Sequence, residues 1–422
     1  MMKLKNIFLM AGVLLACAAG LPSCGGDDND PSNTPTTPST PDTPDTPDTP
    51  DPTDDSFVKG ADISWSSWMK DTGLKLYNAA GEERECTALM KELGMDAIRL
   101  RVFVNPDAAG GYCAGEGTPG KGYCGKDDVV AKATIAKELG MDVMIDFHYS
   151  DTWADPSHQN KPAAWKNMTA TQLKTAIADH TKDVLNALKT AGVTPKWVQV
   201  GNEISAGFLF DKNAATSGAA WDIKNNSNQL IYAGNFDNMV AFINAGYDAV
   251  KSVFKDAIVI LHRDNGWDGY IDENNWGSYR WFFDEIRAKG GKWDMIGMSV
   301  YPYWAVYDAN GNPYSNPKIA EDKVIPAAVE NIKYLANRYN CDVMVVETGM
   351  QCADAKTGQL TTSTILNKGK QQLTLLIEQC QNNTNGRCRG VFYWEPECRP
   401  GKYRLGAFDE SGKPTVIMEA FN

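Results

Sequence analysis

The stretch that decides the fold of this chain occurs twice: Lys-Glu-Leu-Gly-Met-Asp stands at residues 91–96 and again at residues 137–142. Each copy ends a segment with helical periodicity, over residues 82–93 and 127–139, and its glycine ends the helix. An apolar segment typical of a strand follows each copy. The repeat therefore predicts the helix-to-strand junction of a β/α unit.

The same alternation continues along the rest of the chain. Short, almost wholly apolar segments separated by helical patterns predict a parallel sheet covered on both faces. Eight such units favour a closed (β/α)8 TIM barrel in one domain, with an open doubly wound sheet as the alternative. Expected strands span residues 59–63, 97–103, 142–147, 197–200, 257–261, 295–299, 343–346 and 390–394. Further expected helices span residues 171–191, 237–253, 278–288, 325–337 and 364–381.

Composition supports a large folded core. The chain has 422 residues, of which 43% are hydrophobic and 12 are Trp, and this excludes a wholly disordered, collagen-like or coiled-coil protein. The net charge is −12, and nine Asp lie between residues 25 and 56. An acidic chain without a basic stripe repels phosphate backbones, so we expect no nucleic-acid partner.

The first residues, 1–24, predict an export signal. Lys3 and Lys5 precede an apolar run over residues 7–21 that is too short for a stable membrane span. The run ends at Leu-Pro-Ser-Cys, which resembles a bacterial lipoprotein signal whose mature first residue is a lipidated Cys24. Cys17 is the rival lipid site, and ordinary secretion is the simpler alternative.

The stretch from residue 25 to residue 56 repeats Thr, Pro and Asp and contains almost no large apolar side chain. Such a segment cannot bury enough surface to offset its ordering entropy, so it predicts an extended acidic tether. Residues 57–422 then form the folded domain. We expect an outer-membrane lipoprotein that faces the cell exterior, is held by its lipid only and is monomeric.

Eight cysteines follow Cys24, and no spacing among them makes a Cys-x-x-Cys pair. Export permits disulfides. Cys113 and Cys124 flank a glycine-rich loop and are the expected bridge; the pairing of the others is not readable.

Polar residues interrupt the apolar pattern where the predicted strands end. In a (β/α)8 barrel this C-terminal face carries the function. A period of two places Arg99 with Arg101, and Asp146 with His148, on common faces of their strands. The strand-end residues are Asp62 and Ser64, Arg99 and Arg101, Asp146 and His148, Asn202 and Glu203, His262 to Asn265, Tyr301 to Trp304, Glu347, and Trp394 with Glu395.

Glu203 and Glu347 are the candidate catalytic pair, because each closes an apolar strand on opposite parts of the ring. Glycosidic bonds are cleaved by two carboxyl groups, one of which protonates the leaving oxygen while the other meets the oxocarbenium-like centre. For each Glu taken alone, the alternative is a structural role, in which its side chain caps a loop or forms an ion pair there.

Four segments carry a resemblance to a known family. They are Gly-Ala-Asp-Ile-Ser at 60–64, Arg-Leu-Arg-Val-Phe-Val-Asn-Pro at 99–106, Asp-Phe-His-Tyr-Ser-Asp-Thr-Trp-Ala-Asp-Pro at 146–156, and Val-Gly-Asn-Glu at 200–203. From about residue 58 to its end, the chain resembles glycoside hydrolase family 53, the endo-β-1,4-galactanases.

The resemblance implies roles for the strand-end residues. Glu203 would be the acid/base and Glu347 the nucleophile, while Asn202 would bind the sugar 2-hydroxyl. An arginine, Arg99 or Arg101, would keep the nucleophile ionised. Tyr301 would donate a hydrogen bond to the nucleophile, and Trp394 would form the floor of the sugar site. Asp146 and His148 would bind or orient near the acid/base. The expected substrate-binding residues among these are Asp62, Asp146, His148, Tyr301 and Trp394.

Six aromatic residues lie at or just past predicted strand ends, where flat rings can stack on sugar C–H faces. They favour a sugar-binding groove that includes Trp153 and Trp304. The six are Trp65, Trp68, Trp153, Tyr303, Trp304 and Trp394.

No cofactor and no catalytic metal are expected, because phosphate-loop, dinucleotide, zinc-protease and serine-esterase motifs are absent from the sequence and its four His are scattered. A structural calcium is the open alternative, with oxygen ligands from Asp264, Asp268, Asp272 and Glu273.

The sequence therefore predicts a retaining endo-hydrolase of β-1,4-galactan in type I arabinogalactan. The alternatives are a retaining barrel hydrolase of mannan or β-glucan, and a surface glycan-binding lipoprotein without hydrolytic activity.

Overall fold

The protein is described here by a computed structural model that covers residues 56–115, 118–210, 236–268 and 278–422. The expected signal, lipidated Cys24 and tether therefore lie outside the described residues, apart from the last tether residue. Eight parallel strands close into a barrel in the order β1-β10-β9-β8-β7-β6-β5-β4, with β4 paired back to β1. The (β/α)8 prediction is confirmed, and the doubly wound alternative is wrong because the sheet has no free edge.

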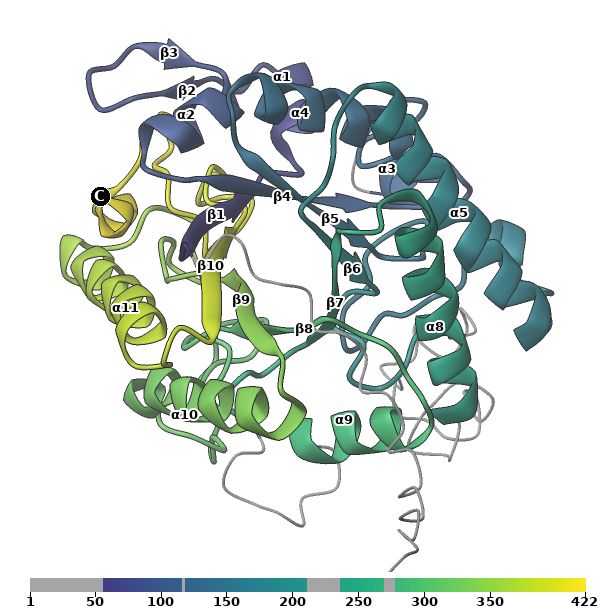
Figure 1. The fold of residues 1–422 in the computed structure, drawn as a ribbon. Helices are drawn as coiled ribbons and strands as arrows, with labels where there is room; N and C mark the ends of the chain where they lie inside the picture. The colour runs from purple at the N-terminus through teal and green to yellow at the C-terminus, as the bar shows by residue number, and fades with distance from the viewer. Residues whose placement is uncertain (1–55, 116–117, 211–235, 269–277) are drawn as a thin grey trace, which may run out of the picture. The chain divides into compact units, whose positions relative to one another are not determined.

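The strands form an inner ring and the helices surround it (Figure 1). The barrel strands are β1 (Val58–Asp62), β4 (Ala97–Val102), β5 (Asp142–Phe147), β6 (Trp197–Val200), β7 (Ile258–Arg263), β8 (Met295–Val300), β9 (Asp342–Thr348) and β10 (Cys388–Trp394). The α-helices are α1 (Ser66–Asp71), α2 (Cys86–Glu92), α3 (Tyr112–Gly115), α4 (Lys126–Glu138), α5 (Ala170–Thr190), α8 (Phe236–Val253), α9 (Tyr279–Ala288), α10 (Glu321–Tyr339) and α11 (Ser363–Asn382). Short 3-10 turns are η1 (Ala163–Trp165) and η3 (Val416–Phe421).

One expected helix begins later than the sequence pattern indicates. Residues of its first turn instead form the strand β3 (Glu83–Arg84), which pairs antiparallel with β2 (Leu76–Tyr77). Glu85 is extended, and its side chain accepts the Ala88 amide as the cap of α2. The helix starts after this cap, because an N-cap residue lies outside the helical conformation.

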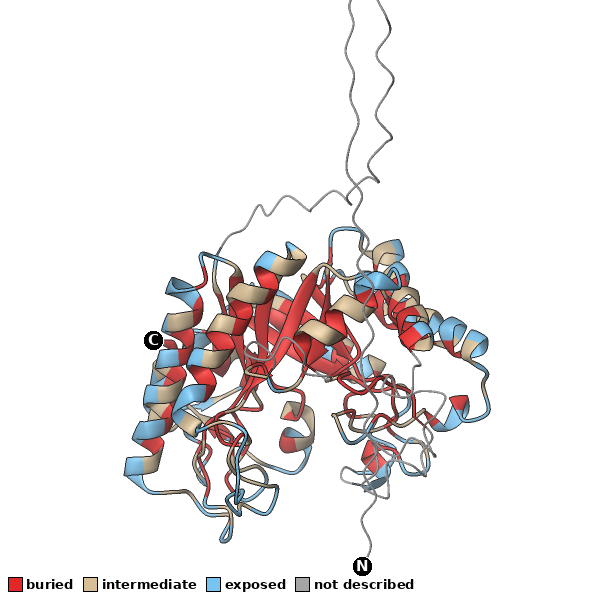
Figure 2. Ribbon diagram, turned by 90° about the horizontal axis from the view of Figure 1, so that it is seen from below, coloured by how far each residue is buried: buried red, intermediate tan, exposed pale blue. Residues whose placement is uncertain are grey.

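Two apolar layers hold the barrel together. Inside the ring, nine buried side chains, among them Trp197 and Phe392, form a core of their own. Gly60 of β1 lies under the Phe392 ring, and a Cβ at that position would come within 2.4 Å of the ring. Figure 2 shows the strands buried and the helices exposed on their outer faces, so the second layer lies between them.

All eight cysteines after Cys24 are free thiols in the structure. The expected Cys113–Cys124 disulfide is therefore wrong. Both residues are buried, and the Cys124 sulfur lies 3.5 Å from the Ser64 carbonyl oxygen, to which the thiol donates. Burial raises the pKa of the Cys124 thiol to about 11, which keeps it protonated.

Among the described residues, no helix combines the length and the apolar character that crossing a membrane requires.

Candidate active site

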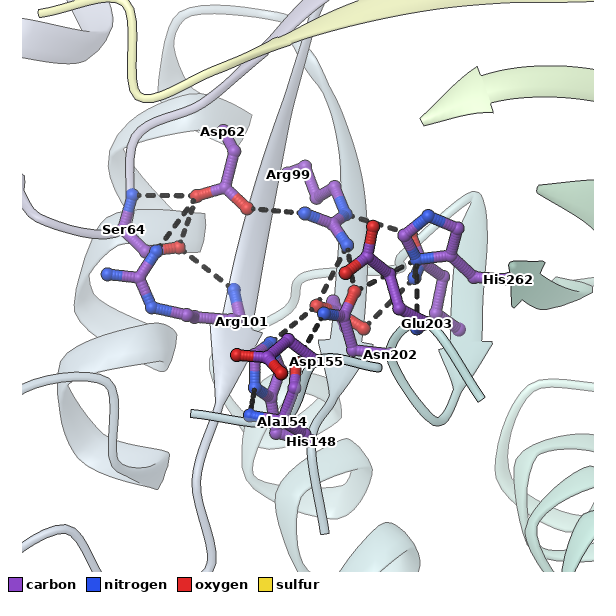
Figure 3. A network of polar contacts seen from close by, with 12 residues as sticks. Asp62, Ser64, Arg99, Arg101, His148, Ala154, Asp155, Asn202, Glu203 and His262 are labelled. Atoms are coloured by element: carbon purple, nitrogen blue, oxygen red, sulfur yellow. Dashed lines mark hydrogen bonds and ion pairs between the residues drawn. The ribbon is translucent and has the colours of Figure 1, made fainter. Parts of the chain in front are cut away.

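The guanidinium of Arg99, on β4, joins three carboxylates from different strands. Its Nη1 lies 2.8 Å from Asp62 Oδ2 and 2.9 Å from Glu347 Oε1, and its Nη2 lies 2.9 Å from Asp146 Oδ2. Arg99, Asp62 and Asp146 are fully buried. Figure 3 shows the Arg99 guanidinium bonded to Asp62. One guanidinium therefore supplies the nearest counter-charge for three acids, and Asp62 has a second, more distant one in Arg101, whose Nη1 lies 3.6 Å from Asp62 Oδ1.

The same guanidinium fixes two amides. Arg99 Nη2 donates to Asn202 Oδ1 at 2.8 Å, and Arg99 Nε donates to Gln199 Oε1 at 2.8 Å. The Asn202 amide nitrogen donates to the Ala154 carbonyl at 2.7 Å. Each amide can therefore take only one orientation, with its oxygen toward Arg99.

Arg101 shares Asp62 with Arg99, at 3.6 Å, but the arginine that pairs with Glu347 is Arg99. Arg101 pairs with Glu395, and its guanidinium lies 4.4 Å from the Trp153 ring centroid, whereas Arg99 contacts Glu347. Arg101 also lies 5.3 Å from Trp65. Through cation–π contacts Arg101 supports the aromatic rings that line the site, Trp153 and Trp394 among them, which we call the aromatic wall.

Glu347 lies in β9 and is 5% exposed. Its Oε2 accepts a hydrogen bond from the Tyr301 hydroxyl at 3.1 Å, on the side away from Arg99. Burial raises the pKa of Glu347 to about 7, and Arg99 works in the opposite direction. Both partners that the resemblance implied for this residue are in place.

Glu203 follows β6 in a left-handed backbone conformation with φ of +45°. A left-handed conformation costs about 1 kcal/mol or more for a residue other than Gly, so neighbouring contacts must hold it. Ser299 Oγ lies 2.6 Å from Glu203 Oε1, and the Ile204 amide donates to the His262 carbonyl. Figure 3 shows the Glu203 side chain beside the His262 ring.

The two carboxyl groups meet across the ring. One oxygen of Glu203, one oxygen of Glu347 and one nitrogen of His262 all lie within 4.8 Å of one another. Burial raises the pKa of Glu203 well above its ordinary value, and the charges of Glu347 and Asp264 raise it further. Within the described part of the chain, an arginine pairs with Glu347 but none with Glu203, and this difference favours the proton on Glu203.

His148 and Asp146 position the loop that follows β5. The His148 Nε2 lies 2.9 Å from Asp146 Oδ2, and its Nδ1 accepts the Ala154 amide at 2.9 Å. Because the Ala154 carbonyl accepts from Asn202, both residues act on the segment beside Glu203 rather than on Glu203 itself.

Of the six aromatic residues expected to form a groove, two are buried: Trp65 and Tyr303 are each 4% exposed. They support their neighbours rather than face solvent. Trp394 packs on Trp65 with 5.1 Å between ring centroids and on Tyr403 with 4.7 Å. Partly exposed rings remain at Trp68, Trp153, Trp304 and Trp394.

The expected calcium ligands are only partly within the described residues, since Asp272 and Glu273 lie outside them. Asp264 accepts hydrogen bonds from Ser205 and Asn265, while Asp268 lies 3.8 Å from Lys318. The His262 nitrogens are likewise engaged, by Asn202 and by Ser299.

Two site residues, Gln199 and Ser299, were not singled out from the sequence. Each is a polar residue inside an otherwise apolar strand, and each is nearly or fully buried. A polar residue among buried apolar neighbours must be hydrogen-bonded, and this is the signal that points to them.

Two close carboxyl groups in the mouth of a (β/α)8 barrel fit the two-carboxyl chemistry of glycosidases. The model of glycosyl hydrolase family 53 matches residues 58–413, so the chain belongs to this family. An uncharacterized protein in the bgaB 5′ region of Niallia circulans is 30% identical over 83% of this chain and 86% of its own length. An endo-β-1,4-galactanase of Bacillus subtilis is 28% identical over 86% of this chain and 75% of its own.

Among solved structures, the family 53 catalytic domain of Ignisphaera aggregans superposes with a TM-score of 0.68 at 26% identity. The match covers 87% of this chain and 96% of that domain.

Proposed function

We propose that this glycosidase is a retaining endo-hydrolase of β-1,4-galactan, the side chain of type I arabinogalactan. The observation that carries the reaction class is the distance of at most 4.8 Å between oxygens of Glu203 and Glu347. Carboxyl groups about 5–5.5 Å apart leave no room for a water between the second carboxylate and the anomeric carbon, so that carboxylate attacks the sugar itself and the reaction is a double displacement. The name of the Bacillus subtilis relative supports galactan as the sugar.

The proposed reaction has two steps. In the first, a Glu347 oxygen attacks the anomeric carbon while Glu203 gives its proton to the departing glycosidic oxygen. In the second, Glu203 takes a proton from water, the water oxygen attacks the anomeric carbon, and the bond to Glu347 breaks. Asn202, fixed by Arg99, can bind the 2-hydroxyl of the sugar in both steps.

Release of reducing sugar from purified galactan, mannan and β-glucan tests the substrate. The catalytic pair does not recognise the configuration at C4 of the sugar. Any preference among the three substrates therefore comes from the residues that bind the sugar. We expect turnover of galactan. Turnover of mannan or β-glucan without galactan would contradict the substrate, and binding of galactan without turnover would favour a glycan-binding protein. Product sizes over time then test endo action, which predicts intermediate oligosaccharides before short ones.

Replacing the acid/base should affect substrates unequally. Glu203→Ala should slow galactan hydrolysis by about 10²–10⁴-fold, since galactan leaves as an alkoxide without proton donation. An aryl β-galactoside with a good leaving group should be slowed less in its first step. Burst-phase kinetics of aryl release separate that step from the second. Equal losses on both substrates would contradict the role of Glu203.

The pH dependence should be bell-shaped. The active form has Glu347 ionised and Glu203 protonated. Activity therefore rises as pH passes the lower apparent pKa of the pair and falls above the higher one. Because burial raises both pKa values, both limbs should lie above the 4.5 of an ordinary glutamate. With an aryl substrate, Glu203→Ala should remove the alkaline limb of the burst; a retained limb would assign it to another group.

For the N-terminal region we propose lipidation at Cys24, a tether up to residue 56 and display on the outer membrane of a monomeric enzyme. Metabolic labelling with a fatty acid tests this. Labelling should be lost in Cys24→Ala and retained in Cys17→Ala, and the reverse result would move the lipid to Cys17.

A further inference from the structure

Glu203 is held by a chain of buried hydrogen-bonding groups that no part of the proposed reaction uses. Ser299 Oγ, on β8, lies 2.6 Å from Glu203 Oε1 and 2.8 Å from Nε2 of His262, on β7. Ser299 is 1% exposed and His262 is fully buried. The single hydroxyl proton of Ser299 can therefore be donated either to Glu203 or to His262, and water does not compete for it.

The other ring nitrogen of His262 also has two kinds of neighbour. Its Nδ1 lies 2.9 Å from Asn202 Oδ1 and 3.1 Å from Gln199 Nε2. Arg99 orients both amides, so Nδ1 faces a fixed acceptor and a fixed donor. The backbone amide of Glu203 is a second, more distant donor to Nδ1, at 3.4 Å. Nδ1 can donate to Asn202 or accept from Gln199.

His262 stays neutral, because burial and the charge of Arg99 lower its pKa well below 6.5. A neutral imidazole carries one proton, on either nitrogen. With the proton on Nδ1, the ring donates to Asn202 and accepts from Ser299. With the proton on Nε2, the ring donates to Ser299 and accepts from Gln199. Both tautomers have partners.

The direction in which the hydrogen bonds between Glu203, Ser299 and His262 are donated can therefore change with the protonation state of Glu203. A protonated Glu203 donates to Ser299, which donates to Nε2 of His262. An ionised Glu203 accepts from Ser299, which accepts from Nε2. Neither state leaves the Glu203 carboxyl, the Ser299 hydroxyl or a His262 nitrogen without a partner, a defect that would cost about 1–3 kcal/mol. Only the long bond from the Glu203 backbone amide is lost when Nδ1 carries the proton.

We propose that Ser299 and His262 are positioning residues that reverse their hydrogen bonds when Glu203 changes between acid and base. They would hold the carboxyl in one place through both steps of the double displacement. The proposal deepens the proposed function and rests on it for the catalytic meaning of the switch. The hydrogen-bond reversal itself can be measured without a substrate.

Other groups also face Glu203, and the experiment has to separate them from Ser299. Charges on Glu347, Asp264 and Asp155 raise its pKa, and two tyrosine hydroxyls are electrostatically coupled to it. By element, the titratable groups are Asp155 after β5, His262 of β7, Asp264 after β7, Tyr279 of α9, Tyr301 after β8 and Glu347 of β9.

The first experiment uses the full chain without substitution. The protein contains four histidines, so the ¹⁵N spectrum of the labelled imidazoles is simple to assign. We expect the Nε2 resonance of His262 to move as pH passes the pKa of Glu203, although His262 itself stays neutral. Glu203→Gln should abolish this movement. A His262 resonance that is constant across the titration, or that moves equally in Glu203→Gln, would overturn the proposal.

The second experiment removes the hydroxyl. Ser299 donates a charge-assisted bond to the ionised carboxyl, which is stronger than the bond it makes to the neutral acid. Ser299→Ala should therefore raise the pKa of Glu203, measured from the ¹³C carboxyl resonance that Glu203→Gln deletes. Thr181→Val, which removes another buried hydroxyl, bonded to Tyr149, is the matched control and should leave that pKa unchanged.

An unchanged Glu203 pKa in Ser299→Ala would overturn the proposal. The two spectroscopic readouts do not depend on galactan, so failure of the substrate assignment is recognised separately. Where galactan is hydrolysed, the alkaline limb of activity should also move to higher pH in Ser299→Ala but not in Thr181→Val.

Discussion

Glu347→Gln should abolish turnover while leaving sugar binding intact. The amide keeps the shape of the carboxyl group but cannot form the covalent bond to the anomeric carbon, so kcat should fall by roughly four to six orders of magnitude. The loss should appear in kcat for galactan and for aryl galactosides alike, since every substrate needs the nucleophile.

Two measurements make this result specific. Calorimetric titration with a galacto-oligosaccharide should still detect binding, because the aromatic wall at Trp153 and Trp394 is unchanged. Glu330→Gln, on the surface of α10, is the matched control and should keep full activity. A Glu347→Gln protein with substantial turnover would remove Glu347 from the mechanism.

Arg99→Met should destabilise the protein more than the loss of any surface charge. The change leaves Asp62, Asp146 and Glu347 without their shared counter-charge in a buried site, and breaking a buried ion pair costs about 3–5 kcal/mol. The free energy of unfolding in urea measures the loss. Arg84→Met, at an exposed ion pair, should leave the midpoint almost unchanged.

The loss of stability in Arg99→Met should be smaller at acidic pH. Burial alone would raise the pKa of Asp146, but Arg99 and His148 lower it below 3.8. The contribution of Asp146 to stability is thus fully present above its unfolded pKa and is lost as pH falls through the folded one. The difference between Arg99→Met and the natural protein should shrink in acid. A constant difference would show that Arg99 acts through packing alone.

The fold was predictable because the sequence pattern of each β/α unit lies within one continuous segment of the chain. Apolar runs of strand length and glycine-terminated helices recur, and closure follows from their number. The error at residues 82–85 arose because a helical pattern does not reveal that Glu85 is extended as a cap. The Cys113–Cys124 error arose because spacing says nothing about which way a buried thiol points.

The candidate site was predictable where strand ends carry charge. Glu203 and Glu347 follow from the rule that barrel function lies at the carboxyl ends of the strands. The choice between Arg99 and Arg101 was not predictable, since both share one face of β4 and only cross-barrel distances separate their partners. Gln199 and Ser299 were missed because each resembles an ordinary interruption of an apolar strand. The roles of Gln199 and Ser299 depend on their contacts with residues from other strands.

The central claim is that Glu203 and Glu347 stand on either side of one β-galactosidic bond and cleave it by double displacement. Proton NMR of linear galactan, recorded in the first minutes after enzyme is added, tests this claim directly through the configuration of the new reducing end. Double displacement retains the configuration, so we expect the β-anomer to appear first and to mutarotate to the α-anomer later. Appearance of the α-anomer first would contradict it, because inversion requires a single displacement by water.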